Sequence, residues 1–195
     1  MIEEHGLEGF STRKLGEALG CEAMSIYHHF PSKTHLLNAL VDRLIAGVVI
    51  PPRELEPIER IRRLSYGYRR IGHQHPRLFP YVALYRMNSP VGLRFLNDTL
   101  GMFRDAGLDA EAMARLFRAF AYYLIGAALD ETLGYSRGPS AVEPVSDAQV
   151  ARDYPLVALA GPYFKQEHFD RTFAAGLEPL LEAIRDAAER AKRHE

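Results

Sequence analysis

The residues best suited to chemistry lie close together between positions 11 and 33. The side chains in this stretch that can donate hydrogen bonds include Thr12, Arg13, Tyr27, His28, His29 and Lys33. Hydroxyl, imidazole and ammonium groups all bind phosphate oxygens, and an arginine guanidinium matches the edge of a guanine with two hydrogen bonds. These residue types favour contact with a phosphate-bearing polymer over catalysis.

Motifs of enzymes and metal sites do not stand out elsewhere. The chain has no Gly-rich phosphate loop, no G-x-S-x-G elbow and no H-E-x-x-H motif. Its single cysteine, Cys21, excludes an internal disulfide and a cysteine-based zinc site, and it suits a reducing cytoplasm. His73 and His75 lie two residues apart on an expected helix and therefore point to different sides. We expect no catalytic residue, no metal and no cofactor.

Composition places the chain among ordinary globular proteins. It has 195 residues, of which 47% are hydrophobic and 25% are charged, with 24 Lys and Arg against 25 Asp and Glu. Because the chain has no overall excess of Lys and Arg, a nucleic acid would have to bind to a local patch of its surface. No apolar run approaches the roughly 20 residues of a membrane helix, and MIEEHGLEGF lacks the basic start of a signal peptide. We expect a cytoplasmic protein without a membrane segment.

The elements that must position these side chains are all helical. Apolar residues recur every three or four positions, and no convincing strand alternation is present, so the fold class is all-α. Helices are expected at 12–19, 22–30, 32–48, 57–74, 90–105, 110–134 and about 166–190. Residues 135–145 form a loop, and Ser146 with Gln149 favours a helix start. Pro51-Pro52 divides a small domain of residues 1–50 from a larger body of residues 51–195.

The first two short helices have the spacing of a helix-turn-helix. Gly16 permits the helices to cross closely, Gly20 turns the chain, and Leu15, Leu19 and Ile26 would lock the second helix on the first. The second helix, of the homeodomain-like type, would then present six side chains to a major groove: Ala23, Met24, Ser25, Tyr27, His28 and His29.

Residues 1 to about 45 resemble the DNA-binding domain of the tetracycline-repressor (TetR) family of transcriptional regulators. The resemblance lies in HGLEGFSTRKLGEALG, in IYHHF at the end of the second helix, and in SKTHLL at the start of the next. It implies a homodimer on a palindromic double-stranded DNA operator, with a small-molecule inducer in the C-terminal domain. By position, Arg13, Ala23 and Met24 would contact bases. Five residues would contact the DNA backbone: Thr12, Ser25, Tyr27, His29 and Lys33.

The resemblance also implies a longer first helix than this chain has. Family members begin with a full helix behind the reading helices, whereas this chain starts at its last turn, MIEEHG. We expect weaker packing of Leu15, Leu19 and Ile26 as a result. Residues 1–50 have a formal charge of 4 − 6 = −2. Both features motivate an alternative function, a helical small-molecule-binding protein that has lost DNA binding.

The body offers candidates for a ligand pocket and a dimer face. Aromatic residues with polar tips suit a mainly apolar pocket for an aromatic or amphipathic inducer. The ligand-binding candidates are Tyr66, His73, Tyr81, Tyr85, Phe103, Phe120 and Tyr123. The last helix carries one apolar stripe, consisting of Phe169, Phe173, Leu177, Leu180, Leu181 and Ile184. This stripe is either a homodimer interface or a surface that packs on the helix at 110–134.

These observations favour a ligand-responsive repressor released from its operator by an inducer. The two alternatives are the small-molecule-binding protein without DNA binding and a helical enzyme.

Overall fold

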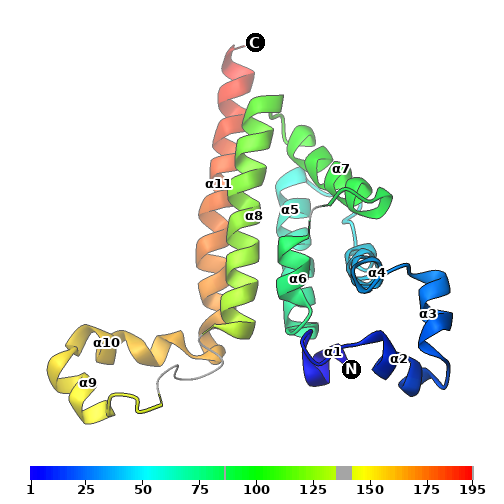
Figure 1. The fold of residues 1–195 in the computed structure, drawn as a ribbon. Coiled ribbons are helices and arrows are strands. Elements are labelled where there is room, and N and C mark those ends of the chain that lie inside the picture. The colour runs from blue at the N-terminus through cyan, green and yellow to red at the C-terminus, as the bar shows by residue number, and fades with distance from the viewer. Residues whose placement is uncertain (86, 135–141, 195) are drawn as a thin grey trace.

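The computed structural model is all-helical, as the sequence predicts, and it describes residues 1–85, 87–134 and 142–194 (Figure 1). Its helices are α1 (Ile2–His5), α2 (Thr12–Leu19), α3 (Ala23–His29), α4 (Lys33–Ala46), α5 (Pro57–Gln74), α6 (Phe79–Leu84), α7 (Pro90–Asp105), α8 (Ala110–Leu133), α9 (Asp147–Asp153), α10 (Pro155–Ala160) and α11 (Phe169–His194). Two 3-10 turns, Gly161–Phe164 and Gln166–His168, join α10 to α11. Of the loop predicted at 135–145, residues 135–141 lie outside the described residues.

Side-chain caps fix where these helices begin. The side chains of Ser11, Ser32, Ser89, Asp109 and Ser146 each accept a hydrogen bond from the backbone N–H three residues further on. Such caps satisfy donors that the first helical turn leaves free. The predicted helices α2 and α5 match the structure residue for residue. The prediction missed the short helices α6 and α10, because one or two turns do not display a full apolar period.

The body is built around α5, which packs against α7, α8 and α11. Helices α8 and α11 run side by side in opposite directions, and the C-terminus lies at one end of this pair (Figure 1). Its core contains several side chains that are less than 2% exposed: Phe79, Phe103, Phe120, Phe173, Leu177 and Leu181. Aromatic edge contacts such as Phe103 to Phe120, at 5.6 Å between ring centroids, help to pack this core.

A buried ionic cluster joins three helices of the body. The Nε of Arg69 in α5 donates to Glu131 Oε2 in α8 at 2.6 Å, and its Nη1 donates to Asp170 Oδ1 in α11 at 2.7 Å. His73 Nε2 lies 2.7 Å from the same Glu131 oxygen. Arg69 and Glu131 are both nearly fully buried, so losing either partner would leave an uncompensated charge in the core.

Helices α9 and α10 form an arm that extends away from the base of the α8–α11 pair (Figure 1). They pack mainly on each other and on the following 3-10 turn. Several large apolar side chains of the arm are more than half exposed: Tyr154, Leu156, Val157, Leu159 and Tyr163. The arm therefore has an apolar surface that the described residues do not cover.

Among the described helices, α8 alone is long and apolar enough to cross a membrane by length and composition. Core helices of water-soluble proteins pass the same test, and α8 packs on α5, α7 and α11. Only part of its apolar surface is buried within the chain, however.

Candidate functional site

Helices α2 and α3 cross at Gly16, as predicted for a helix-turn-helix. A Cβ at Gly16 would lie 2.7 Å from the carbonyl oxygen of Cys21 and 3.3 Å from the backbone nitrogen of Ala23. Any side chain there would force the helices apart. Gly20 ends α2 with a φ of 67°, a left-handed conformation that glycine adopts without strain. The tight turn that the spacing predicted is therefore confirmed.

The apolar contacts that hold α3 in place differ in part from the prediction. Ile26 is buried with Phe10, Leu36 and Leu37, as expected for the residue that locks α3. Leu19, which was expected to join it, is 66% exposed. It lies in the last turn of α2, beyond the crossing point at Gly16. Phe10 and Leu36 provide the contacts assigned to Leu19.

Helix α3 presents one face to solvent. Met24 is 67% exposed and Tyr27 is 40% exposed. Ser25, His28 and His29 are also exposed, and Ala23 is half-buried. Arg13 in α2 is exposed as well, where it forms an ion pair with Glu17 at 3.2 Å. Seven of the nine predicted DNA-binding residues are therefore exposed once Lys33 is included, while Ala23 is half-buried and Thr12 is buried.

Thr12 and Tyr27 are joined to each other rather than standing as separate groups. The buried hydroxyl of Thr12 donates to the hydroxyl oxygen of Tyr27 at 2.8 Å. Since Tyr27 accepts this bond, its own proton remains available to a phosphate oxygen. Thr12 thus orients Tyr27 across the α2–α3 crossing.

Lys33 also has partners within the chain. Its Nζ donates to the carbonyl oxygens of Leu7 and Phe10, at 3.1 and 2.9 Å, and lies 5.4 Å from the centre of the Phe10 ring. An ammonium group has three protons, so one remains for a phosphate. The same lysine therefore fixes the segment before α2 and could contact DNA.

Polar contacts attach this N-terminal helical head, residues 1–50, to the body. On α4, Asn38 Oδ1 accepts from the hydroxyl of Tyr81 at 2.9 Å. Asp42 Oδ1 accepts from the hydroxyls of Tyr85 and Ser89, at 3.2 and 2.7 Å. These three donors belong to α6 and to the segment that leads into α7.

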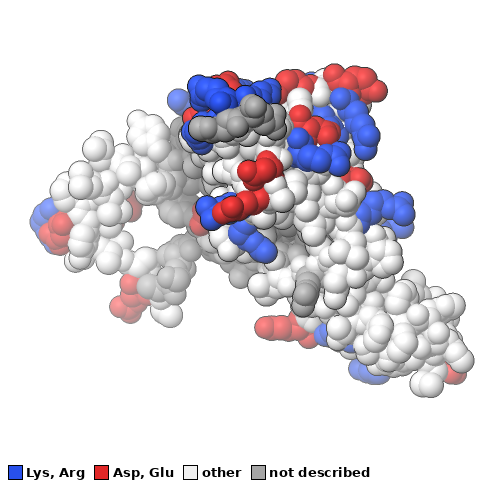
Figure 2. Space-filling view, turned by 90° about the horizontal axis from the view of Figure 1, so that it is seen from above, with Lys and Arg blue, Asp and Glu red and all other residues white. Residues whose placement is uncertain are grey.

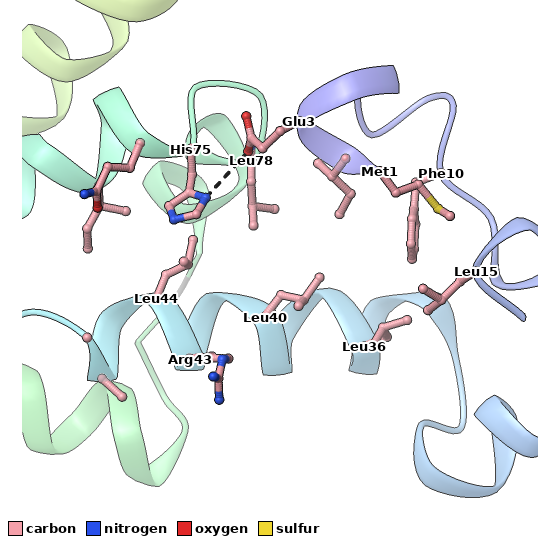
Figure 3. A pocket seen from close by; sticks show the side chains of 15 residues that line it. Met1, Glu3, Phe10, Leu15, Leu36, Leu40, Arg43, Leu44, His75 and Leu78 are labelled. Carbon is pink, nitrogen blue, oxygen red and sulfur yellow. Dashed lines mark hydrogen bonds and ion pairs between the residues drawn. The ribbon is translucent and has the colours of Figure 1, made fainter. Parts of the chain in front are cut away.

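A second attachment lies at Glu3 of α1. Its carboxylate accepts from the backbone N–H groups of Arg77 and Leu78, at 3.1 and 3.2 Å, and lies 4.0 Å from His75. Between the two attachments is a hollow of about 840 Å³, lined by Leu36, Leu40 and Leu44 of α4 and by Phe10 and Leu78 opposite (Figure 3). The head is therefore joined to the body around a mainly apolar hollow that α4 borders.

A smaller cavity of about 70 Å³ lies within the body between α5, α7 and α8. Its walls are almost entirely apolar and include Leu64, Phe95, Phe117 and Phe120. Tyr68 and Thr99 also line it, as does Met87 just before α7. It has the character of a small-molecule site, which is concave and apolar with few polar groups.

The seven predicted ligand-binding residues do not converge on this cavity, and only Phe120 lines it. Four of the other six use their polar groups in contacts with other segments of the chain. Tyr81 and Tyr85 donate to α4, Tyr123 donates to the carbonyl oxygen of Phe173 at 2.6 Å, and His73 contacts Glu131. Phe103 is fully buried, and Tyr66 packs edge-on against Phe173 at 5.1 Å. Sequence reasoning missed Tyr68, which it took for a member of the apolar stripe of α5.

The predicted dimer residues of α11 face the interior of the chain. Phe169, Phe173, Leu177, Leu181 and Ile184 are all buried. Leu180 is half-buried. Five of the six side chains are therefore buried by contacts within one chain. This agrees with the alternative in which the stripe packs on the helix at 110–134. The outward face of α11 carries instead Ala175, Pro179, Glu182 and Asp186.

Charges of both signs are mixed on the surface drawn in Figure 2, where Lys and Arg lie beside Asp and Glu on the body. The arm in the same view is mostly uncharged. Among the described residues, no group of three or more His, Cys, Asp or Glu side chains is placed to hold a metal ion.

Helix α3 is exposed and is held in place by the buried Ile26, and a larger helical body follows it. This arrangement is that of a helix-turn-helix regulator. Two family models match the chain. The one described as "Bacterial regulatory proteins, tetR family" matches residues 1–40, and the one described as "Tetracyclin repressor-like, C-terminal domain" matches residues 52–187. The chain therefore belongs to the TetR family of ligand-responsive, DNA-binding transcriptional repressors, which is not a family of enzymes.

Individual relatives agree with this assignment. The chain is 26% identical over 194 residues to the tetracycline repressor protein class A from transposon 1721 of Escherichia coli, covering 94% of this chain and 85% of the relative. A crystal structure of a possible TetR family transcriptional regulator from Streptomyces coelicolor A3(2) has a TM-score of 0.76 at 26% identity, covering 95% and 93% of the two chains. ActR of Streptomyces coelicolor in complex with actinorhodin has the same fold, with a TM-score of 0.76 at 24% identity and coverage of 96% and 92%.

Proposed function

We propose that this protein is a cytoplasmic homodimeric repressor in which two copies of the head, residues 1–50, read the halves of a palindromic operator. The observation that carries the proposal is the exposed face of α3 beside an exposed Arg13. In this proposal Arg13, Met24 and the half-buried Ala23 contact base edges, and Tyr27, Ser25 and His29 contact phosphates; the exposure of α3 supports these assignments. His28 lies on the same exposed face.

The body, residues 51–195, holds the inducer in the cavity between α5, α7 and α8. Support comes from its apolar walls and from the shared fold of ActR, which has been crystallised with actinorhodin. Met87 lines the cavity, and the neighbouring Tyr85 and Ser89 hold Asp42 of α4. A ligand that displaces Met87 would shift this segment and with it the head, which changes the spacing of the two reading helices.

The outward faces of α8 and α11 form the dimer interface. On α8 the exposed residues are small or apolar, including Ala119, Tyr122 and Gly126, with Arg115 and Arg118 beside them. On α11 the acidic Glu182 and Asp186 are exposed. Small residues permit close helix packing, and opposite charges across a two-fold axis favour self-association.

Selection of the purified protein on a random duplex library at moderate salt tests this function. A palindrome with half-sites about one helical turn apart is expected, since each subunit reads one half-site. The sequence contacts are then tested with Arg13→Ala, which is expected to relax preference at one base pair by about 1 to 3 kcal/mol. Failure to enrich any sequence would contradict DNA reading and favour a small-molecule-binding protein without DNA.

A further inference from the structure

Another pocket lies where the linker between head and body meets α5 and α7. It has a volume of about 500 Å³, which is within the usual range of small-molecule sites, and it shares no lining residue with the apolar cavity. Its walls come from the linker at residues 50–53, from α5, from α7 and from the start of α8. Half of its lining residues have charged or amide side chains: Arg53, Arg60, Asn97, Asp98, Arg104 and Asp105.

Arg60 brings a buried guanidinium group to this pocket. Only 5% of its side chain is exposed. Its Nη1 donates to Asp105 Oδ2 at 2.9 Å and its Nε donates to the carbonyl oxygen of Pro51 at 3.4 Å, whereas its Nη2 has no hydrogen bond with a described residue. Within the described part of the chain, no fully enclosed side-chain nitrogen or oxygen lacks a partner, so this Nη2 borders accessible space. Its two N–H groups are therefore available to a ligand in the pocket that Arg60 lines.

The charges around the pocket favour a ligand with a single negative charge. Three arginines and two aspartates line it, a formal 3 − 2 = +1. Asp105 is neutralised from two sides, because its Oδ2 accepts from Arg60 and its Oδ1 lies 3.3 Å from Arg104 Nη2. Arg53 is exposed and has no ion pair with a described residue, so its charge is free for a ligand. A dianion would exceed the positive charge and would meet the half-buried Asp98.

The remaining walls are apolar, and a glycine leaves part of them bare. Ile50, Leu100 and Met113 line the pocket from three segments of the chain. Gly101 lies inside α7, where glycine costs roughly 0.5 to 1 kcal/mol relative to alanine. A Cβ at Gly101 would meet no packed neighbour within 4 Å, so close packing does not require the glycine. Its missing side chain leaves space for a ligand beside the apolar walls.

We propose that this pocket binds a small organic acid with one carboxylate and an apolar body. The carboxylate accepts hydrogen bonds from the free Nη2 of Arg60 and from the guanidinium group of Arg53, which suit carboxylate oxygens. The apolar body lies against Ile50, Leu100 and Met113. Because Arg53 belongs to the linker and Arg60 to α5, a bound acid ties the linker to the body. The inference does not rest on the repressor function.

Three probes of similar size test the proposal by ligand-observed NMR titration of the full chain at pH 7.5 without DNA. Phenylacetate carries one negative charge, phenylacetamide carries none, and phenyl phosphate carries nearly two. Phenylacetate is expected to bind on the order of ten times more tightly than phenylacetamide, because its hydrogen bonds to the arginines are charge-assisted. Phenyl phosphate is expected to bind more weakly than phenylacetate.

Variants of the arginines test which groups hold the carboxylate. Arg53→Gln is expected to weaken phenylacetate binding by about tenfold. Arg70→Gln removes the same charge from an exposed position of α5 outside the pocket, so it is the matched control and leaves the affinity unchanged. Arg60→Lys keeps a charge beside Asp105 but has no Nη2, and it is expected to weaken phenylacetate binding as Arg53→Gln does.

A filling variant fixes the location. Gly101→Leu places a side chain in the pocket and favours the helical state of α7, so the protein is expected to fold and to lose phenylacetate binding. The proposal is overturned if phenylacetamide or phenyl phosphate binds as tightly as phenylacetate, if Arg53→Gln behaves like Arg70→Gln, if Gly101→Leu binds phenylacetate unchanged, or if no probe binds. Because no DNA is present, these outcomes are separate from the operator selection.

Discussion

Individual side chains of the head serve both the fold and the proposed DNA contact. Thr12 is buried and orients Tyr27, and Lys33 holds two carbonyl groups while one of its protons remains free. A group whose position is fixed by a second bond loses less conformational entropy when it meets a phosphate. The residues proposed to contact the DNA backbone are thus preorganised by the chain itself.

Replacing Tyr27 with phenylalanine removes the proton offered to the phosphate and leaves the hydroxyl of Thr12 without its acceptor. We expect affinity for every duplex to fall by roughly 1 kcal/mol, with the preferred sequence unchanged. Fluorescence anisotropy on specific and scrambled duplexes measures this. Cys21→Ser, an exposed change in the same turn, is the control. A changed base preference in Tyr27→Phe would contradict a backbone role.

At the scale of elements, α4 connects the head to the cavity wall. Its Asp42 accepts from Tyr85 and Ser89, which lie on either side of the cavity residue Met87. The Asp42 carboxylate is therefore the contact through which a change at the cavity would reach the head.

Removing the acceptor with Asp42→Ala is expected to loosen α4 from the body. Amide hydrogen exchange in α4 should accelerate by roughly tenfold, as for a local loss of about 1 to 1.5 kcal/mol, while exchange in α8 stays the same. Asp42→Asn keeps an acceptor oxygen and is the matched control. Unchanged exchange in α4 of Asp42→Ala would show that this contact does not hold the head.

Helices α5 and α11 are joined by a second ionic contact on the surface. Arg62 donates from Nε and Nη2 to the two carboxylate oxygens of Glu178, at 2.9 and 2.7 Å, and from Nη1 to Glu59 at 2.7 Å. Hydrogen bonding from Arg62 holds the pKa of Glu178 below its ordinary value. Hydrogen bonds from Arg63 and Arg62 do the same to the pKa of Glu59.

Because the pKa of Glu178 is lower in the folded protein, this contact stabilises the fold above the ordinary glutamate pKa and is lost as pH falls through the lowered value. We expect Glu178→Gln to be less stable than the unmodified protein at pH 7 and to approach it in acid, below about pH 4. Urea unfolding at the two pH values measures the difference. A loss of stability in Glu178→Gln that stays constant with pH would contradict the lowered pKa of Glu178.

At the scale of the whole molecule, the apolar surfaces that the described residues leave uncovered include one on α8 and one on α9 and α10. One is the outward face of α8 around Tyr122, which is 67% exposed, and the other is the arm of α9 and α10. Exposed apolar surface of this extent commonly marks a contact with another protein. In the proposed dimer, the α8 and α11 faces of two copies cover the first of these surfaces.

Tyr122→Glu places a charge in the middle of the proposed interface. The protein is expected to sediment as one chain rather than two, and its operator affinity should fall at least tenfold, since a single head reads only a half-site. Leu93→Glu, at an exposed apolar position on α7, is the control. A Tyr122→Glu protein that remains dimeric would place the interface elsewhere.

The sequence by itself determined the helices and the helix-turn-helix. The cap at Ser146 and the apolar period of α5 act within a few residues, so local spacing was enough to predict them. Gly16, Gly20 and Ile26 also lie within one short segment, and their roles followed from spacing alone. Leu19 was the exception, because its exposure depends on where α2 ends relative to the crossing.

Only the tertiary structure decided which aromatic residues are free to meet a ligand. Tyr81, Tyr85 and Tyr123 donate to acceptors that lie 43 to 50 residues away in the chain. The local spacing of residues cannot reveal such distant partners. Among the residues that the structure describes, Tyr68 has no such acceptor. In the same way, one apolar stripe on α11 was compatible with a core or an interface, since the sequence records the apolar face of a helix but not the surface that covers it.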